Sequence, residues 1–178
     1  MKSFKEVKTC RVCGNNDLVP VLSLGKQVLS GIFPRSAKQK IPETPLDLVK
    51  CNTKTRPNTC GLIQLRHSAN VEEMYGTTYG YYSSLSSSMV NHLKKIVEKL
   101  SIIHALKSGD SVLDIGCNDG TLLNLIEVKG LKKVGIDPSS KKFSESFNKD
   151  INLICDYFSD RVVREHVGDC EFQHITAI

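Results

Sequence analysis

One glycine-containing turn in this chain is well suited to hold a nucleotide-like cofactor. In VLDIGCNDGTLL, an apolar strand-like run enters a turn with Gly116 and Gly120, and a predicted helix begins near Thr121. Gly116 lets the backbone turn sharply beside a ligand, Gly120 permits close packing of helix and strand, and the helix N-terminus offers free amide groups. The segment therefore predicts a cofactor-binding loop.

The spacing and charge of this loop indicate which cofactor it binds. A dinucleotide fingerprint needs G-x-G-x-x-G, but Asn118 and Thr121 occupy the second and third glycine positions counted from Gly116. Asp114 and Asp119 would repel a pyrophosphate, whereas S-adenosylmethionine carries an ammonium and a sulfonium group. We therefore predict an S-adenosylmethionine site. The loop residues assigned to it are Asp114, Gly116, Asn118 and Gly120.

Two further carboxylates follow the next two strand-like runs. Asp137 ends KKVGID, where a carboxylate can accept the hydroxyls of a ribose. Asp156 follows the run LIC, where it could accept the exocyclic amine of adenine, with Tyr157 or Phe158 covering the ring. Capping of the following helices is the simpler alternative for both carboxylates. Their position at consecutive strand ends favours binding of the cofactor.

Four cysteines near the start of the chain have the pattern of a metal site. Cys10 and Cys13 form a C-x2-C pair followed by a glycine, and two thiolates on one tight turn can bind the same tetrahedral ion. The second pair is Cys51 and Cys60, although eight residues separate these two cysteines instead of two. We predict that all four bind one zinc ion.

This zinc site has alternatives: a redox dithiol, unliganded core cysteines, or a site in which His67 replaces one cysteine. Four protein ligands leave no coordination position for water or substrate, so we expect a structural zinc. The chain has seven cysteines. An odd number in a chain without an export signal argues against a disulfide framework.

The elements that must position the cofactor loop alternate between strand and helix patterns. After Gly109 the strand-like runs are SVLDIGC, KKVGID, INLICDYF and FQHITAI, with three helix-like segments between them. This alternation predicts right-handed crossovers and an α/β fold with a doubly wound, parallel, Rossmann-like methyltransferase sheet. Before it, apolar residues at helical spacing in MVNHLKKIVEKL predict a helix from about 87 to 106.

Composition divides the chain into parts. We predict a zinc-binding module over residues 1–70, a linker with a tyrosine cluster and a helix over 71–108, and an incomplete S-adenosylmethionine-binding domain over 109–178. Residues 1–70 carry 12 Lys and Arg against 4 Asp and Glu, whereas residues 71–178 carry 12 against 15. The basic first part could attract a phosphate-bearing partner or simply form a solvated surface.

Two features of the sequence bear on its cellular location and extent. No run approaches the roughly 18 apolar residues that span a bilayer, and the start MKSFKEVKTC lacks the apolar core of a secretion signal. We therefore expect a cytoplasmic protein. The sequence stops on the apolar run HITAI with no helix to cover it, so we expect a fragment of a longer protein.

The order of these motifs resembles a known family. C-x2-C-G, CGLIQL, Y-x3-YGYYSS, VLDIGCNDGTLL and GIDPS follow one another as in the nucleotide-sugar C-methyltransferases that carry a zinc-binding domain. The resemblance covers nearly the whole chain, and the cysteine module combined with the GCNDG loop is more specific than either alone. It implies S-adenosylmethionine-dependent transfer of a methyl group to a ring carbon of an NDP-linked keto-deoxysugar.

The resemblance also implies where the catalytic groups lie. In the family, a proton-abstracting histidine and a neighbouring acidic residue lie beyond the fourth strand, where this sequence has ended, so the catalytic base is unknown. The substrate-facing tyrosine segment of the family corresponds to Tyr75, Tyr79, Tyr81 and Tyr82. Tyr79 and Tyr81 are the candidates for hydrogen bonds to cofactor or sugar, and packing of a linker is their alternative role.

Two other function classes stay open. A nucleic-acid methyltransferase could dock through the basic cysteine module, but that module lacks a dense Lys and Arg stripe interleaved with aromatic residues. A non-catalytic module that binds zinc and cofactor is the third reading. We expect a small-molecule substrate, a nucleotide sugar, and neither a nucleic acid nor a membrane as partner.

Overall fold

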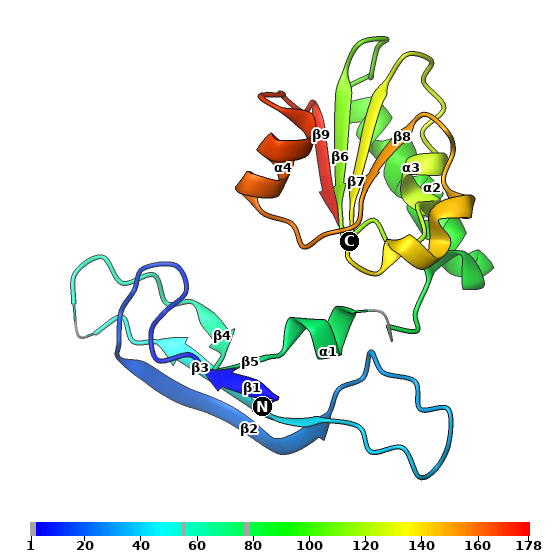
Figure 1. Ribbon diagram of the computed structural model, residues 1–178. Helices are drawn as coiled ribbons and strands as arrows, with labels where there is room; N and C mark the ends of the chain where they lie inside the picture. Colours follow the sequence, from blue (N-terminus) through cyan, green and yellow to red (C-terminus); the bar gives the residue numbers. More distant parts are fainter. Residues whose placement is uncertain (1–2, 55, 77–78) are drawn as a thin grey trace. The chain divides into compact units, whose positions relative to one another are not determined.

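A computed structural model describes residues 3–54, 56–76 and 79–178. The chain divides into two compact units, Met1–Gly80 and Tyr81–Ile178, which run from blue to green and from green to red in Figure 1. The predicted boundaries at residues 70 and 108 are a finer division, which stays a prediction. Within the described ranges, no helix is both long and apolar enough to cross a membrane.

Antiparallel strands build the first unit (Figure 1). The elements are β1 (Phe4–Glu6), β2 (Leu18–Val28), β3 (Glu43–Cys51), β4 (Ile63–Leu65), β5 (His67–Ala69) and the helix α1 (Val71–Tyr75). One sheet has the order β2-β3-β4, and β1 pairs separately with β5.

The first unit has a very small apolar core. Among its described residues, the buried apolar side chains are Cys10, Leu29, Val49 and Cys51. The long strand β2 is exposed along nearly its whole length and presents several large apolar side chains to solvent. Burial of so little apolar surface cannot offset the chain entropy lost on folding, so this unit needs a cross-link. Two of its four core residues are predicted metal ligands.

A parallel four-stranded sheet forms the centre of the second unit, in the order β8-β7-β6-β9. Its strands are β6 (Ser111–Ile115), β7 (Lys132–Ile136), β8 (Ile151–Ile154) and β9 (His174–Ala177). All three pairings are parallel, and each strand coincides with one of the four predicted runs. The predicted α/β fold class is confirmed. The loop after β6 therefore starts at the carboxyl edge of the sheet, where ligands of such folds bind.

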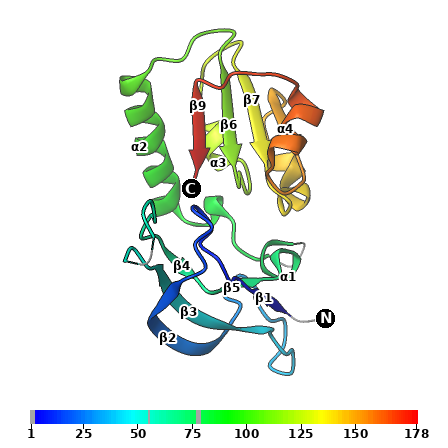
Figure 2. The ribbon, with the colours of Figure 1, turned by 90° about the vertical axis from the view of Figure 1, so that its left-hand side faces the viewer.

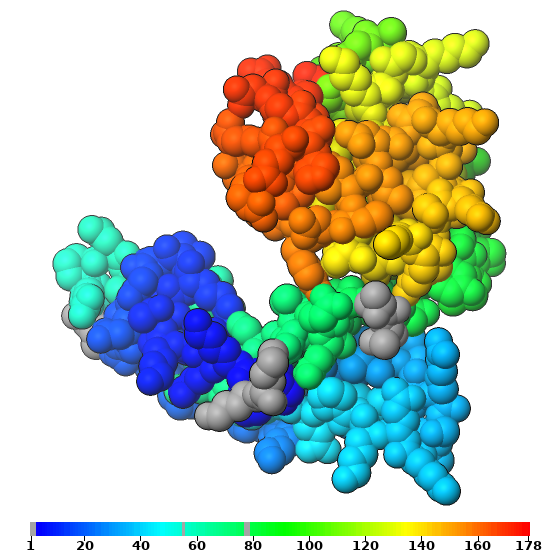
Figure 3. Space-filling view, in the orientation of Figure 1, coloured from blue at the N-terminus to red at the C-terminus, as the bar shows by residue number. Residues whose placement is uncertain are grey.

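Helices cover both faces of this sheet (Figure 2). Leu93 of α2 (Ser87–Ile103) and Leu123 of α3 (Thr121–Asn124) pack with Val112 on one face. Val162 of α4 (Asp160–Val167) packs with Leu113 on the other. Neighbouring residues of β6 thus point to opposite faces, as the strand period requires. In the space-filling view, the orange and red residues around α4 cover one side of the unit (Figure 3).

The helical segments are shorter than the sequence pattern predicts. α2 ends at Ile103 rather than near 106, because His104 adopts an extended backbone. The helix after the cofactor loop has one turn, and the poor helix formers Val128 and Gly130 follow it. The segment after β7 is a 3-10 helix, η2 (Ser140–Ser146), and a further one, η1 (Ser83–Leu85), precedes α2. The sheet is parallel, as predicted, although these helical segments are short.

Candidate functional site

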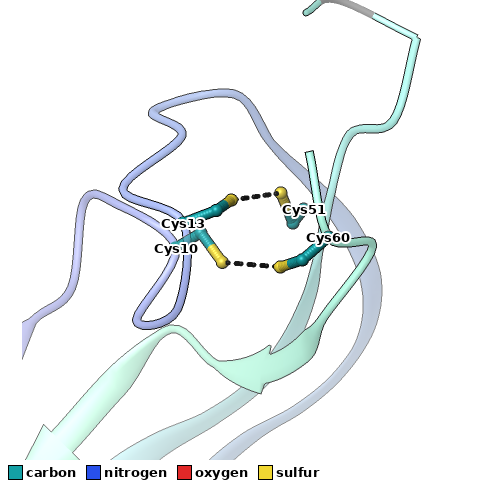
Figure 4. Close-up of side chains that lie close together, drawn as sticks. All are labelled: Cys10, Cys13, Cys51 and Cys60. Atoms are coloured by element: carbon teal, nitrogen blue, oxygen red, sulfur yellow. Dashed lines mark hydrogen bonds between the residues drawn. The ribbon is translucent and has the colours of Figure 1, made fainter. Parts of the chain in front are cut away.

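The four predicted zinc ligands lie together in the first unit (Figure 4). All four sulfur atoms are within 4.8 Å of one another. The Sγ atoms of Cys10 and Cys60 are 3.4 Å apart, and those of Cys13 and Cys51 are 3.5 Å apart. Zinc bonds to sulfur at about 2.3 Å, so the edges of a tetrahedral site are roughly 3.8 Å. The cluster therefore has the dimensions of a four-cysteine zinc site.

Backbone geometry prepares this cluster for a cation. Gly14 and Gly61, which follow Cys13 and Cys60, have φ values of 71° and 67°, which glycine tolerates without strain. Backbone amides of Asn15 and Cys60 donate to the Cys13 sulfur and lower the pKa of its thiol to about 6. Cys13 is thus readily ionised, and the thiolate is the form that binds metal.

The cysteines do not all ionise equally well beside one another. The Leu62 amide favours the Cys60 thiolate, but the sulfurs of Cys10 and Cys13 and burial outweigh it and raise the pKa of Cys60 to about 11. A divalent ion removes this competition because it attracts every thiolate. The chemistry of this donor set therefore fits zinc.

Two buried amide side chains, which the cysteine spacing does not identify, hold the turn between Cys10 and Cys13 in place. Asn15 donates to the Cys51 sulfur (3.4 Å) and to the carbonyl of Asn52 (3.1 Å). Gln64 accepts from the backbone amide of Arg11 (2.8 Å) and donates to the carbonyl of Thr9 (3.1 Å). The signal was present in CGLIQL, where one glutamine interrupts an apolar run.

His67, the alternative zinc ligand, lies outside the cysteine cluster. Its ring packs edge-on against Phe4 at 5.2 Å between centroids. Its Nδ1 atom is 3.6 Å from a carboxylate oxygen of Asp47. His67 therefore joins β5 to β1 and β3 and leaves the four cysteines as the donor set.

In the second unit, the two loop glycines have different functions. Gly116 has φ 74°, and a Cβ atom built there would meet nothing within 4 Å. Gly120 has φ 77°, and its Cβ would lie 2.6 Å from the ring of Phe147. Gly116 thus leaves open space beside the loop, whereas Gly120 lets an aromatic ring pack on it. The close approach of loop and strand occurs instead at Gly135, where a Cβ would be 2.8 Å from the Cys117 sulfur.

Asp137 lies directly after β7, and its carboxylate accepts a hydrogen bond from the backbone of the loop. Its Oδ2 atom accepts the backbone amide of Asn118 (3.0 Å), and its Oδ1 atom accepts the amide (2.6 Å) and the hydroxyl (2.7 Å) of Ser139. A carboxylate oxygen accepts about two hydrogen bonds. Oδ1 is therefore fully used, whereas Oδ2 can accept one more donor, such as a hydroxyl group.

Asp114 is a buried carboxyl group, 4% exposed, at the penultimate residue of β6, just before the loop. Burial raises its pKa to about 6, although a hydrogen bond from Thr176 (2.7 Å) opposes this shift and the charge of Asp137 adds to it. Thr176 lies directly opposite Asp114 in the register of β9 and β6. Two carboxylates so close together in a buried site favour a positively charged ligand.

We expect Asp114→Asn to stabilise the ligand-free chain at neutral pH. The folded state holds the Asp114 proton up to a pH of about 6 and the unfolded state releases it near 4, so wild-type stability falls between these values as pH rises. An asparagine at position 114 carries no charge, so it avoids this loss of stability, and its side-chain oxygen still accepts the hydrogen bond from Thr176. The expected gain in unfolding free energy is about 2 kcal/mol at pH 7.5 and smaller at pH 5.

Thermal unfolding of the second unit at both pH values measures this gain. Glu127→Gln, a change at an exposed side chain, is the control and should show neither the gain nor its pH dependence. If Asp114→Asn and the wild type lose stability equally between pH 5 and 7.5, the assignment of a costly buried charge to Asp114 is wrong.

Asn118 and Asp119 contact the segment that precedes α2. The side chain of Asn118 donates to the carbonyl of Tyr81 (3.1 Å) and accepts the amide of Ser83 (3.1 Å). Asp119 accepts the amide of Ser84 at 2.8 Å. The structure thus brings the loop and part of the tyrosine segment together within the second unit.

The remaining predicted site residues are placed as follows. Asp156 is half-buried after β8, and its carboxylate accepts the amide of Tyr157 (2.7 Å). Tyr79 belongs to the first unit, where its ring lies against Gly31 and is 5.6 Å from the ring of Tyr75. Tyr81 belongs to the second unit and is 37% exposed. The two candidate tyrosines therefore belong to different units.

Two family models match separate parts of the chain. Residues 10–75 match the family described as "Putative zinc binding domain". These residues include all four clustered cysteines. Residues 97–175 match the family described as "Methionine biosynthesis protein MetW". This second match includes the cofactor loop, the strands β6, β7 and β8 and the start of β9.

Curated proteins similar to this chain are methyltransferases. C-methyltransferase NovU of Streptomyces niveus is 30% identical over 163 residues, which are 90% of this chain and 37% of the relative. The 27-O-demethylrifamycin SV methyltransferase of Amycolatopsis mediterranei (strain S699) is 24% identical over 125 residues, 68% of this chain and 45% of the relative. The chain thus spans less than half the length of either relative.

Proposed function

We propose that this chain, which resembles the zinc-binding-domain methyltransferases in both of its parts, binds S-adenosylmethionine and serves methyl transfer to a ring carbon of an NDP-linked keto-deoxysugar. One observation carries the proposal. Gly116, which has open space beside it, begins the loop at the carboxyl edge of a parallel sheet, and the buried carboxylates Asp114 and Asp137 lie in β6 and directly after β7. The match to a C-methyltransferase over 90% of the chain supports it.

The residues around this space suit the parts of the cofactor. Bound S-adenosylmethionine supplies an electrophilic methyl group. The buried Asp114 carboxylate would counter the positive charge of the ligand, which in turn would favour its ionised form. The free acceptor position on Asp137 Oδ2 would take a ribose hydroxyl. Asp156, after the next strand, is proposed to accept the adenine amine.

The zinc ion has a structural part in this proposal. Four cysteine ligands leave no open coordination position for a substrate. The small core of the first unit explains why a metal cross-link is needed there. We propose that zinc keeps the first unit folded and takes no part in the methyl transfer.

The sugar substrate is the finer part of the proposal. A ring carbon next to a ketone becomes nucleophilic only after a base removes its proton and a donor stabilises the enolate oxygen. Tyr79 and Tyr81 are proposed as hydrogen-bonding groups at this stage, because a phenol can donate to an oxygen anion. The base itself is not assigned to any residue of this chain.

Ligand-observed NMR tests the choice of substrate. We expect the zinc-loaded chain, saturated with S-adenosylhomocysteine, to transfer saturation to the sugar protons of a dTDP-linked 4-keto-6-deoxysugar. Tyr81→Phe removes one proposed hydrogen bond and should weaken this binding about tenfold or less. Tyr75→Phe, at a tyrosine of the same segment that is not one of the two hydrogen-bonding candidates, is the matched control. Saturation of the thymidine protons alone, with none on the sugar, would contradict the sugar assignment.

A further inference from the structure

The side chain of Asn118 uses both of its polar atoms on one short segment. Its amide nitrogen donates to the carbonyl of Tyr81 and its oxygen accepts the amide of Ser83, both at 3.1 Å. Asn118 is 8% exposed and has φ 52°, a left-handed backbone that asparagine tolerates better than most residues. The residue between its two contacts is Tyr82.

Asp119 adds a third hydrogen bond to the same segment. Its Oδ2 atom accepts the amide of Ser84 at 2.8 Å. Its Oδ1 atom accepts the amide (3.2 Å) and the hydroxyl (2.7 Å) of Thr121, at the start of α3. Burial acts against the charged form, but these hydrogen bonds outweigh it and lower the pKa of Asp119. The carboxylate is therefore ionised and fixed in orientation.

The segment Tyr81–Ser84 also contacts the element that follows Asp137. The ring of Tyr82 lies 5.3 Å from the ring of Phe143 in η2, between centroids. The backbone amide of Asn118 donates to Asp137, the proposed ribose ligand. Asn118 thus touches the cofactor carboxylate through its main chain and the tyrosine segment through its side chain. Asn118 therefore links the two sites directly, beside the contact between the rings of Tyr82 and Phe143.

We propose that Asn118 and Asp119 are positioning residues that fix Tyr81–Ser84 as one wall of the cofactor site, so that cofactor binding and the order of this segment are coupled through Asn118. The inference rests on the proposed cofactor site. The side chain of Asn118 holds the segment through both of its polar atoms, so its contribution to the site is to place Tyr81 and Tyr82.

Amide hydrogen exchange, measured by NMR on the zinc-loaded chain, tests this inference residue by residue. The amides of Ser83 and Ser84 donate to different side chains, Asn118 and Asp119. Asn118→Gly removes both side-chain hydrogen bonds to the segment, which we call the clamp, and keeps a residue suited to φ 52°. It should speed exchange at Ser83 by about tenfold. Asp119→Ala should do the same at Ser84.

Two further variants separate the clamp from a general loss of stability. Asn118→Asp keeps an acceptor for the Ser83 amide but loses the donor to Tyr81, so Ser83 should stay protected. Asn124→Ala loses hydrogen bonds with Ser146 and Asn148 on the same side of the sheet and should leave Ser83 unchanged. Equal Ser83 exchange in Asn118→Gly and the wild type would overturn the clamp.

Addition of S-adenosylhomocysteine tests the coupling. In the wild type, the ligand should slow exchange at Ser83 and Ser84 by a further severalfold, and Asn118→Gly should lose this effect. Binding without added protection of these amides would overturn the coupling. If the wild type binds no S-adenosylhomocysteine, the proposed function fails, whereas the Ser83 rates measured without ligand still decide whether Asn118 holds the segment.

Discussion

Removal of zinc is expected to unfold the first unit and to leave the second unit folded. Structural zinc contributes about 10–16 kcal/mol of apparent binding free energy in zinc-finger peptides, and the first unit has only four buried apolar side chains among its described residues. The second unit has a core on each face of its sheet and no metal cluster among its described residues. A chelator should therefore collapse the chemical-shift dispersion of the NMR signals of β2 and β3 and leave the signals of the second unit dispersed.

Cys13→Ser should reproduce the effect of the chelator, because it removes a predicted zinc ligand whose thiol pKa is lowered to about 6. The matched control is Cys155→Ser, which changes an exposed cysteine of the second unit outside the cluster. Metal content by atomic absorption should fall from one zinc per chain to about none in Cys13→Ser only. A zinc-free Cys13→Ser chain that keeps the native signals of β2 and β3 would contradict the structural role of the metal.

Asp137→Ala is expected to abolish measurable binding of S-adenosylhomocysteine, a loss of about a hundredfold or more. The carboxylate offers the free acceptor for a ribose hydroxyl and also holds the amide of Asn118 in the loop. Its removal leaves the buried amides of Asn118 and Ser139 without their acceptor, which costs about 1–3 kcal/mol of stability. Calorimetric titration, with thermal unfolding of the same sample, measures both effects.

Ser139→Ala separates the ligand contact from support of the loop. It removes one donor to Asp137 Oδ1 and keeps the carboxylate, so affinity should change by about threefold or less. A second pair of variants avoids Asp137 altogether. Gly116→Ala and Gly109→Ala each force a side chain into positive φ with no neighbour within 4 Å, and only Gly116→Ala should weaken binding. Folded Asp137→Ala with wild-type affinity would contradict the proposed contact.

The first two strands of the parallel sheet could be predicted from the sequence because each is a mainly apolar run followed directly by glycine or aspartate. SVLDIG and KKVGID became β6 and β7 with Asp137 beside the loop, as expected. The four cysteines were equally accessible to prediction, since few residue types bind zinc. The eight residues between Cys51 and Cys60 did not prevent the cluster.

The supporting contacts could not be predicted in the same way. Asn118 and Asp119 bond to residues 35 positions away or more, and Gln64 bonds to residues 53 and 55 positions away. No periodicity relates such partners, because tertiary packing brings them together. Sequence spacing assigned Asn118 to the cofactor, and its contacts to Tyr81 and Ser83 became visible only in the folded chain.

The lengths of the helices after β6 and β7 also depend on tertiary contacts. Asn124, at the end of α3, bonds to the backbone of Ser146 and Asn148, and Ser146 bonds to the carbonyl of Asp119. These bonds tie η2 to the cofactor loop and replace the further helical turns that the apolar spacing favoured. Together with the poor helix formers Val128 and Gly130, this anchoring accounts for the short helical segments.

Calorimetric titration of the zinc-loaded wild-type chain with S-adenosylhomocysteine tests the central claim most directly, because it depends on the cofactor loop and on no assigned catalytic base. The account predicts one binding site with a dissociation constant in the micromolar range, about −8 kcal/mol, and no heat with NAD, whose pyrophosphate the loop carboxylates repel. A folded, zinc-loaded chain that gives no heat with S-adenosylhomocysteine would contradict the account.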